Sequence, residues 1–305
     1  MSEDESEPVP SEQNEPVSKE LADSFAKELS RHGYGFQFSV IRKAHELVNK
    51  GRSVWRFVAS EFPVEVQGAG TRIDFILHRS RTMGGFDTSP IFLLAECKKA
   101  NPKMSNWCFI RTRYTHNNVW GDTQYFIVEC LEKDGNDGLR VYAKQSFSTD
   151  KAYHLAVEVR SNMKGEPSGE TGRAIENAAT QVSRHLNGYI KAVAANPQFL
   201  EGQKLVFFMP VIFTTARLFV TKVDISVTDQ MTGKIELTKD QVEAVPWLYY
   251  QYSLSPGLKH SIERKDQPKT VSDLLESEYI RTIAVVSAEG VEDFLNHASR
   301  VELRS

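Results

Sequence analysis

Residues 91–98 limit the fold more than any other part of the chain. They read Ile-Phe-Leu-Leu-Ala-Glu-Cys-Lys, so five consecutive apolar residues are followed by Glu96 and, two positions later, by Lys98. Pro90 stands directly before the run, where a strand can begin. An apolar run of this length is typical of a strand that is covered on both faces of its sheet. We therefore expect a buried strand with a charged end.

Periodic patterns on either side of this strand predict a mixture of helices and strands. Apolar residues at three- and four-residue steps predict helices over residues 38–49, 171–195 and, near the end of the chain, up to about residue 297. Alternating or continuous apolar runs predict strands over residues 54–66, 71–79, 125–131, 139–143, 153–159, 204–213, 217–223 and 280–286. Because strands alternate with helices, we expect an α/β core with a mixed central sheet flanked by helices.

Charge is distributed unevenly along the chain. The formal net charge is −3, but residues 1–20 hold seven acids and one base, so residues 21–305 together carry +3. Residues 1–18 are rich in Ser, Glu and Pro, a composition that cannot bury enough surface to fold. We therefore expect a disordered acidic tail over residues 1–20 and a single domain over residues 21–305. Its mild positive charge is compatible with a phosphate-bearing ligand but does not argue for one.

Cysteine spacing and hydropathy exclude several classes of protein. Cys97, Cys108 and Cys130 form no CxxC pair and show no ligand spacing to histidine, so neither a disulfide framework nor a zinc site is predicted. The acidic N-terminus is not that of a signal peptide, and no apolar run approaches the length that spans a bilayer. We expect a cytoplasmic protein with no membrane contact.

The candidate chemistry lies at the charged end of the buried strand. Glu96 and Lys98 are two positions apart, so their side chains leave the same face of the sheet. Asp74 lies in the middle of the preceding predicted strand and would come alongside Glu96 if the two strands pair. Carboxylates at a sheet end can hold Mg²⁺, which activates water and neutralises a scissile phosphate, and a lysine can help. The alternative is a polar strand end that reaches solvent, where Glu96 and Lys98 pair locally.

This arrangement resembles the PD-(D/E)XK, or restriction-endonuclease-like, nuclease superfamily. The resemblance is carried by Gly70-Thr71-Arg72-Ile73-Asp74 on the second predicted strand and by Ala95-Glu96-Cys97-Lys98 on the third. Ile73 stands where the motif that names the superfamily has proline. The resemblance covers about residues 35–100 and 170–223. It treats residues 101–160 as a long insertion after the third strand and residues 224–305 as a C-terminal elaboration.

The resemblance also implies roles for individual residues. Asp74 and Glu96 match the metal ligands of the superfamily and Lys98 its catalytic lysine. Many members add a Glu on the first helix and a Gln on the second, which implies a metal role for Glu46 and a catalytic role for Gln181. The implied cofactor is Mg²⁺, with Mn²⁺ able to substitute, and the implied substrate is DNA more than RNA.

The expected function is therefore a Mg²⁺-dependent endonuclease, in a restriction or phage-defence setting. No reader domain is recognisable, so a homodimer or a targeting partner protein is expected to direct it. Two alternatives remain open. The first is an inactive module on the same fold that binds nucleic acid or protein, and the second is an interaction protein with an unrelated α/β fold.

A run of bases and aromatic residues lies within the predicted insertion. Trp107, Arg111 and Arg113, together with Arg72, could hold phosphates and stack on bases. The alternative is a satellite core under the insertion, with Arg111 and Arg113 on its solvent-exposed face. Arg72 could instead pair with Asp74.

Overall fold

The computed structural model describes most of the chain beyond the acidic tail. The described residues are 18–31, 33–79, 82–83, 86–87, 89–111, 124–133, 139–149, 152–160, 173–196, 205–222, 228–258 and 279–300. The predicted disordered tail, except for its last three residues, lies outside them, as does Arg113. None of the helices within these ranges is both long and apolar enough to cross a bilayer.

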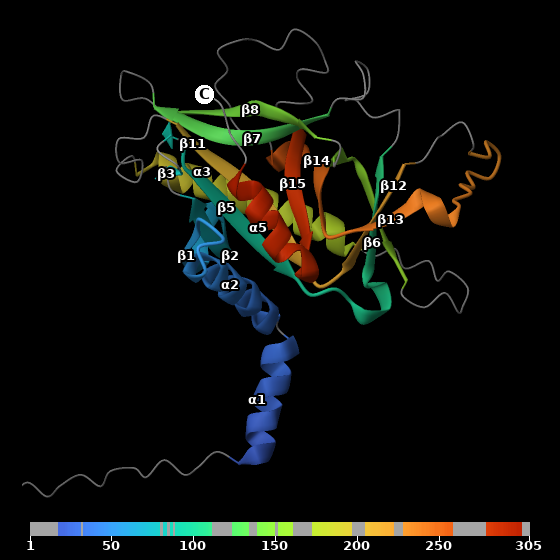
Figure 1. The fold of residues 1–305 in the computed structure, drawn as a ribbon, viewed down its shortest axis with the longest axis horizontal. Helices are drawn as coiled ribbons and strands as arrows, with labels where there is room; N and C mark the ends of the chain where they lie inside the picture. The colour runs from blue at the N-terminus through green and yellow to red at the C-terminus, as the bar shows by residue number, and fades with distance from the viewer. Residues whose placement is uncertain are drawn as a thin grey trace, which may run out of the picture.

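A large mixed sheet forms the centre of the molecule (Figure 1). Antiparallel β1, β2 and β5 lie at one end, β11 and β15 continue parallel to β5, and β14 is antiparallel to β15. The path of neighbouring strands runs β1(Trp55–Val66), β2(Ala69–Arg79), β5(Ile91–Lys98), β11(Leu205–Thr214), β15(Ile280–Ser287), β14(Trp247–Ser253) and β9(Ala152–Tyr153). Off this path, β7(Gln124–Lys133) pairs with β11 and with β8(Leu139–Thr149). The prediction of an α/β protein with a mixed sheet is confirmed.

A second, smaller sheet lies beside the large one. It consists of β10(Leu155–Val159), β6(Asn106–Arg111), β12(Arg217–Lys222) and β13(Val242–Val245), in that order. A separate two-stranded ribbon is made by β3(Thr82–Met83) and β4(Phe86–Asp87). The described helices are α1(Lys19–Arg31), α2(Tyr34–Asn49), α3(Ala174–Ala194) and α5(Val291–Ser299), with 3-10 turns at Pro102–Met104, Lys239–Gln241, Pro256–Leu258 and Ala288–Gly290.

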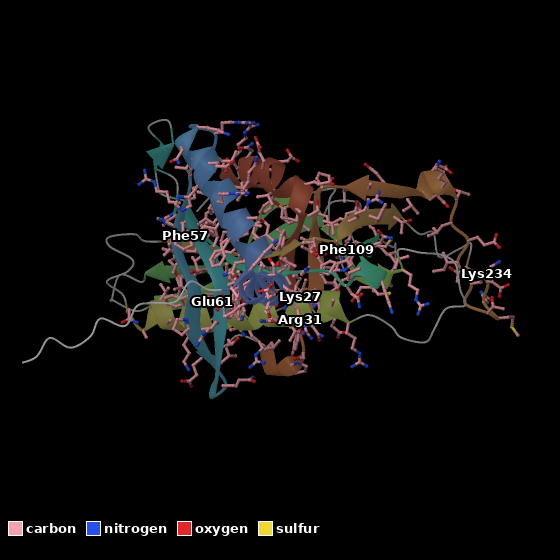
Figure 2. All side chains as sticks on the ribbon, turned by 90° about the horizontal axis from the view of Figure 1, so that it is seen from below. Lys27, Arg31, Phe57, Glu61, Phe109 and Lys234 are labelled. Carbon is pink, nitrogen blue, oxygen red and sulfur yellow. The ribbon has the colours of Figure 1, made fainter. Side chains whose placement is uncertain are left out.

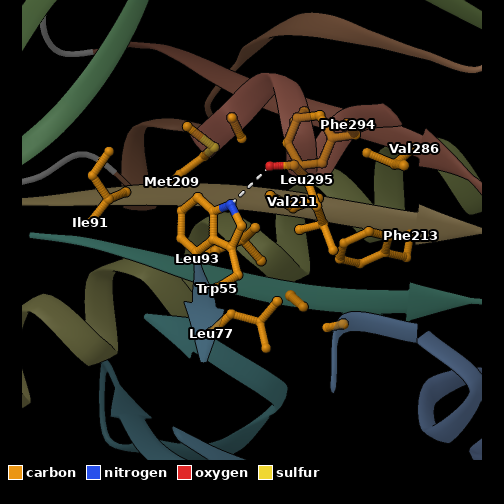
Figure 3. Close-up of a cluster of buried hydrophobic side chains, with 14 of the residues drawn as sticks. Trp55, Leu77, Ile91, Leu93, Met209, Val211, Phe213, Val286, Phe294 and Leu295 are labelled. Atoms are coloured by element: carbon orange, nitrogen blue, oxygen red, sulfur yellow. Dashed lines mark hydrogen bonds between the residues drawn. The ribbon is translucent and has the colours of Figure 1, made fainter. Parts of the chain in front are cut away.

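Helices cover both faces of the large sheet, which explains why its central strands are mostly apolar. All ten residues of β11 are buried, as a strand covered on both sides requires. On one face α2 and α5 pack over a cluster that includes Trp55, whose Nε1–H donates to the Leu295 carbonyl at 3.1 Å (Figure 3). On the other face α3 packs over the clusters that contain Val182 and Leu186. Figure 1 shows α5 on the near side of the sheet and α3 on its far side.

Two contacts fix the position of α3, the helix that carries Gln181. Its first turn is capped by Glu158 of β10, whose Oε1 accepts the backbone N–H groups of Ala174 and Ile175. Near its middle, Gly188 lies so close to β1 that a Cβ atom there would stand 2.7 Å from Cβ of Val64. The cap sets where α3 begins, and the glycine sets how closely it lies on the sheet.

The segments expected as an insertion and an elaboration are parts of the central sheets. Strands from residues 101–160 enter both sheets, because β7 pairs with β11, β9 pairs with β14, and β6 and β10 make half of the small sheet. From residues 224–305, β15 lies between β11 and β14. The predicted strand at residues 153–159 is in fact two strands in different sheets. Periodicity identifies a strand but not its partner, so these long-range pairings were not predictable.

One helix, α1, was not predicted. Ser18 caps it, accepting the backbone N–H of Leu21 on its Oγ at 3.2 Å. None of its residues is buried, and Figure 1 shows the helix projecting from the body of the molecule.

Candidate functional site

Pairing of β2 with β5 brings Asp74 and Glu96 together. The antiparallel register sets Phe75 opposite Ala95, so the next position along each strand is Asp74 and Glu96. The backbone N–H of Cys97 donates to Oδ2 of Asp74 at 2.6 Å. The predicted pairing of the two strands is therefore confirmed, and the two carboxylates are neighbours.

Lys98 links this pair of carboxylates to α3. Its Nζ lies 2.6 Å from Oε1 of Glu96 and donates to Oε1 of Gln181 at 2.9 Å. Asp74, Glu96, Lys98 and Gln181 thus meet from two strands and one helix. Glu96 has only 1% of its side chain exposed, whereas Lys98 has 28% exposed. The alternative of a strand end that reaches solvent does not hold for Glu96.

Burial and mutual repulsion disturb the ionisation of the two carboxylates. Burial raises the pKa of Glu96 to about 8, and the negative charge of Asp74 adds to the increase. Burial also raises the pKa of Asp74 to about 6, against the lowering effect of its hydrogen bond from Cys97. Without a further positive charge nearby, ionising both groups at neutral pH is costly.

His185 and Thr71 complete the buried side of the cluster. Nδ1 of His185 lies 3.3 Å from Oε2 of Glu96, and its Nε2 lies 3.0 Å from Oγ1 of Thr71. Burial, followed by the charges of Lys98 and Arg184, lowers the pKa of His185 to about 4. The imidazole is therefore neutral beside Glu96 at physiological pH. Sequence reasoning missed this residue, although it follows Gln181 by four positions and so shares its helix face.

Gln37 of α2 and Glu61 of β1 also lie next to Asp74. Nε2 of Gln37 donates to the Asp74 carbonyl at 2.6 Å and to Oε1 of Glu61 at 3.1 Å. Glu61, labelled in Figure 2, has a left-handed backbone with φ of 51°, and its charge contributes to the raised pKa values of Asp74 and Glu96. Strained backbone of this kind concentrates at functional sites. No pattern in the sequence marks either residue, because both depend on how α2 lies on β1.

The donor set fits a hard divalent cation held by few protein groups. Oε2 of Glu96 is buried and makes no hydrogen bond in the structure, with Nδ1 of His185 3.3 Å away. Asp74 supplies a second carboxylate beside it. Among the described residues no group of three or more His, Cys, Asp or Glu side chains is arranged to hold a metal ion. Mg²⁺ needs only one or two carboxylates, since waters and substrate oxygens complete its shell.

The structure does not bring Glu46 into this cluster. Its side chain is exposed on α2 and lies 3.7 Å from Arg42 in a surface ion pair. Glu46 follows Gln37 by nine residues, which puts it about 13 Å further along the axis and on the opposite side of the helix. The metal role predicted for Glu46 is not supported, and Gln37 is the residue of this helix that reaches the site.

The four residues predicted to contact nucleic acid differ in how accessible they are. Trp107 is fully buried in a core cluster that the small sheet shares with α3 and the large sheet, so it cannot stack on a base. The alternative of a core position holds for Trp107, although this core is not a satellite of the insertion. Arg111 ends β6 and is half-buried, and Arg113 is not among the described residues. Arg72 is exposed on β2 and lines a shallow surface pocket of about 570 Å³ with Gly70 and Thr71.

Comparisons of the chain with protein-family models, with curated proteins and with solved structures found no match. A function is therefore inferred from the geometry of the cluster and from the resemblance of its motif.

Proposed function

We propose that this protein is a metal-dependent nuclease of the restriction-endonuclease-like type, which hydrolyses phosphodiester bonds in DNA. One observation carries the proposal: Asp74 and Glu96 adjoin each other, and Lys98 bridges Glu96 to Gln181. These are the residues to which the PD-(D/E)XK motif gives metal-binding and catalytic roles. Elements far apart in the sequence supply them.

Each residue has a distinct task in this reaction. Asp74 and Glu96 would hold a divalent cation, which supplies charge for the phosphate and acidifies a bound water. Lys98 is partly exposed, and its ammonium offsets negative charge that develops on the phosphate and orients the attacking water. Gln181 holds the Lys98 amine in place by accepting its hydrogen bond. His185, held in turn by Thr71, lies against the inner oxygen of Glu96 and limits its rotation.

The first test measures cleavage of DNA by the purified chain with Mg²⁺ and with Mn²⁺. We expect Glu96→Gln, Asp74→Asn and Lys98→Ala each to lower the cleavage rate by at least about 100-fold, as loss of a charged catalytic group does. Glu46→Gln is the matched control, because it removes a carboxylate from the exposed face of α2. That variant should cut at the wild-type rate.

Metal binding distinguishes an active nuclease site from an inactive binding module. Calorimetric titration with Mn²⁺ should show binding to the wild type that Asp74→Asn loses and Glu46→Gln keeps. If the wild type binds DNA but neither binds Mn²⁺ nor cuts, the chain is a binding module on the same fold. If all three site variants cut as fast as the wild type, the site assignment is wrong.

A further inference from the structure

The hairpin of β1 and β2 carries a pocket on its exposed face. It is the shallow pocket of about 570 Å³ that Arg72 lines together with residues of both strands. Pairing of the strands sets Pro63 opposite Arg72. It also sets Glu65 opposite Gly70, so the four residues share one face of the hairpin. All four are exposed, and the pocket is therefore open to a ligand along its whole length.

The opposite face of the same hairpin is packed against α3. Val64 lies so close to Gly188 that the helix and the strand are in direct contact. Oγ1 of Thr71 lies 3.0 Å from Nε2 of His185, and Nδ1 of that ring lies 3.3 Å from Oε2 of Glu96. These contacts hold the floor of the pocket in a fixed position relative to the carboxylates of the candidate site.

Arg72 brings a positive charge to this pocket that no neighbouring group neutralises. Within the described part of the chain it makes no hydrogen bond or ion pair. It does not pair with Asp74, whose carboxylate instead accepts the backbone N–H of Cys97. Because Arg72 precedes Asp74 by two residues of a strand, their Cα atoms are about 7 Å apart, which is close to the separation of neighbouring phosphates in a DNA strand. A free guanidinium at this distance is suited to hold a phosphate by two parallel hydrogen bonds.

We propose that this pocket is the subsite for the nucleotide next to the cleaved bond, an inference that rests on the proposed nuclease function. Its phosphate binds Arg72, and its sugar and base lie over Pro63 and Gly70. The charges of the pocket fix this direction, because Glu65 at the other end repels a phosphate. A Cβ atom at Gly70 would meet nothing within 4 Å, so the floor leaves room for a ring. The volume lies in the range of pockets that hold one small ligand, so a single nucleotide fits.

Binding of a fluorescein-labelled DNA oligonucleotide in EDTA tests the phosphate contact without cleavage. The logarithm of the binding constant falls with the logarithm of the salt concentration, by about 0.7 for each phosphate contacted in a single strand and about 0.9 in a duplex. Arg72→Gln should make the slope shallower by this amount, because one contact is lost. Lys234→Gln removes a positive charge far from Glu61, as Figure 2 shows, and should leave the slope unchanged. An unchanged slope in Arg72→Gln, or a wild type that does not bind, overturns the proposal.

Filling the pocket tests the place of the sugar and base. Gly70→Leu adds a side chain where the structure leaves open space, so the variant should fold. It should weaken binding of the oligonucleotide by about tenfold, as loss of contact with one base does, and keep the wild-type salt slope. Ala69→Leu adds a similar side chain on the opposite face of the strand and should bind within about twofold of the wild type. Wild-type affinity in a folded Gly70→Leu overturns the proposal.

Cleavage identifies the phosphate that Arg72 holds. Each phosphate next to the cleaved one is replaced in turn by an uncharged methylphosphonate. One of the two replacements should slow cleavage by the wild type about tenfold, as loss of a charge-assisted hydrogen bond does, and should not slow Arg72→Gln further. Equal slowing of both proteins overturns the proposal. If the wild type binds with the expected slope change in Arg72→Gln but does not cut, the subsite stands and the proposed nuclease function fails.

Discussion

Glu96 is a carboxylate that the fold buries almost completely beside a second carboxylate. Its pKa is raised by burial and by Asp74 to about 8 in the folded chain, whereas in an unfolded chain it is close to 4.5. The folded state therefore keeps a proton over a pH range in which the unfolded state has lost it. Stability in the absence of metal falls as pH rises from about 4.5 towards 8, because the unfolded state binds fewer protons there.

Replacing Glu96 by glutamine should reverse this effect. In EDTA at pH 8 we expect Glu96→Gln to be more stable than the wild type by a few kcal/mol, given about 1.36 kcal/mol for each unit of pKa change. The difference should become small near pH 4.5, where the wild-type residue is protonated in the folded state and half protonated in the unfolded state. Urea unfolding at pH 4.5, 6 and 8 measures it, with Glu46→Gln as the control. A difference that is the same at all three pH values contradicts the assigned cause.

Among the residues of the cluster, those that strand geometry and the motif define were predictable from the sequence, and the others were not. Glu96 and Lys98 share a face because they are two apart, and Asp74 needed only the pairing of adjacent strands. Glu61 could not be predicted, because its place depends on a local left-handed backbone within β1. Trp107 was open to two readings because alternation of aromatics with bases does not reveal which face of a strand is covered.

At the scale of elements, the fit of α3 against β1 determines where Gln181 and His185 lie. Gly188→Ala would place a methyl group 2.7 Å from Cβ of Val64, so α3 or β1 has to shift. We expect this variant to lose about 1–3 kcal/mol of stability, as overpacking does, and to lose cleavage activity as the site loosens. Urea unfolding measures the first effect and the DNA assay the second.

Gly35 offers the matched control for this change. It also lies in a helix, but a Cβ atom there would meet nothing within 4 Å. Gly35→Ala should leave stability unchanged or increase it by up to about 1 kcal/mol through helix propensity. Equal losses in the two variants would show that contact with Val64 is not the cause.

Most helices and strands were predictable to within a few residues because periodicity is a local property. The helix expected at residues 38–49 is α2(Tyr34–Asn49), and that expected at residues 171–195 is α3(Ala174–Ala194). The first turn of α2 was missed because it contains Gly35 and directly follows Gly33, and glycine has low helix propensity. The strand expected at residues 153–159 divides at His154, where the chain passes from the large sheet to the small one. A change of sheet of this kind depends on strands far away in the sequence, and no local sequence pattern indicates it.

At the scale of the whole molecule, a buried ion pair ties the end of the chain to its middle. Arg281 of β15 pairs with Glu129 of β7, and both side chains are almost wholly buried. Arg281→Met would remove the counter-charge of a buried carboxylate, so we expect a loss of about 3–5 kcal/mol. Adding Glu129→Leu should recover most of this loss, since two apolar residues of similar size can replace a buried pair. Urea unfolding of the three variants checks the order, and a double variant no better than Arg281→Met would contradict it.

The position of β15 has a consequence for the synthesis of the chain. One edge of β11 pairs with β5. On the other edge Leu205–Phe208 pairs with β7, but Val211–Thr214 has no partner until β15 has been synthesised. Between Thr214 and Ser287 the ribosome must add 73 residues, which takes about 4–15 s. During that time a strand that is apolar up to its last residue keeps open backbone groups that a neighbouring nascent chain can pair with. A holdase chaperone that covers this edge should therefore raise the yield of folded protein more than one that acts after release.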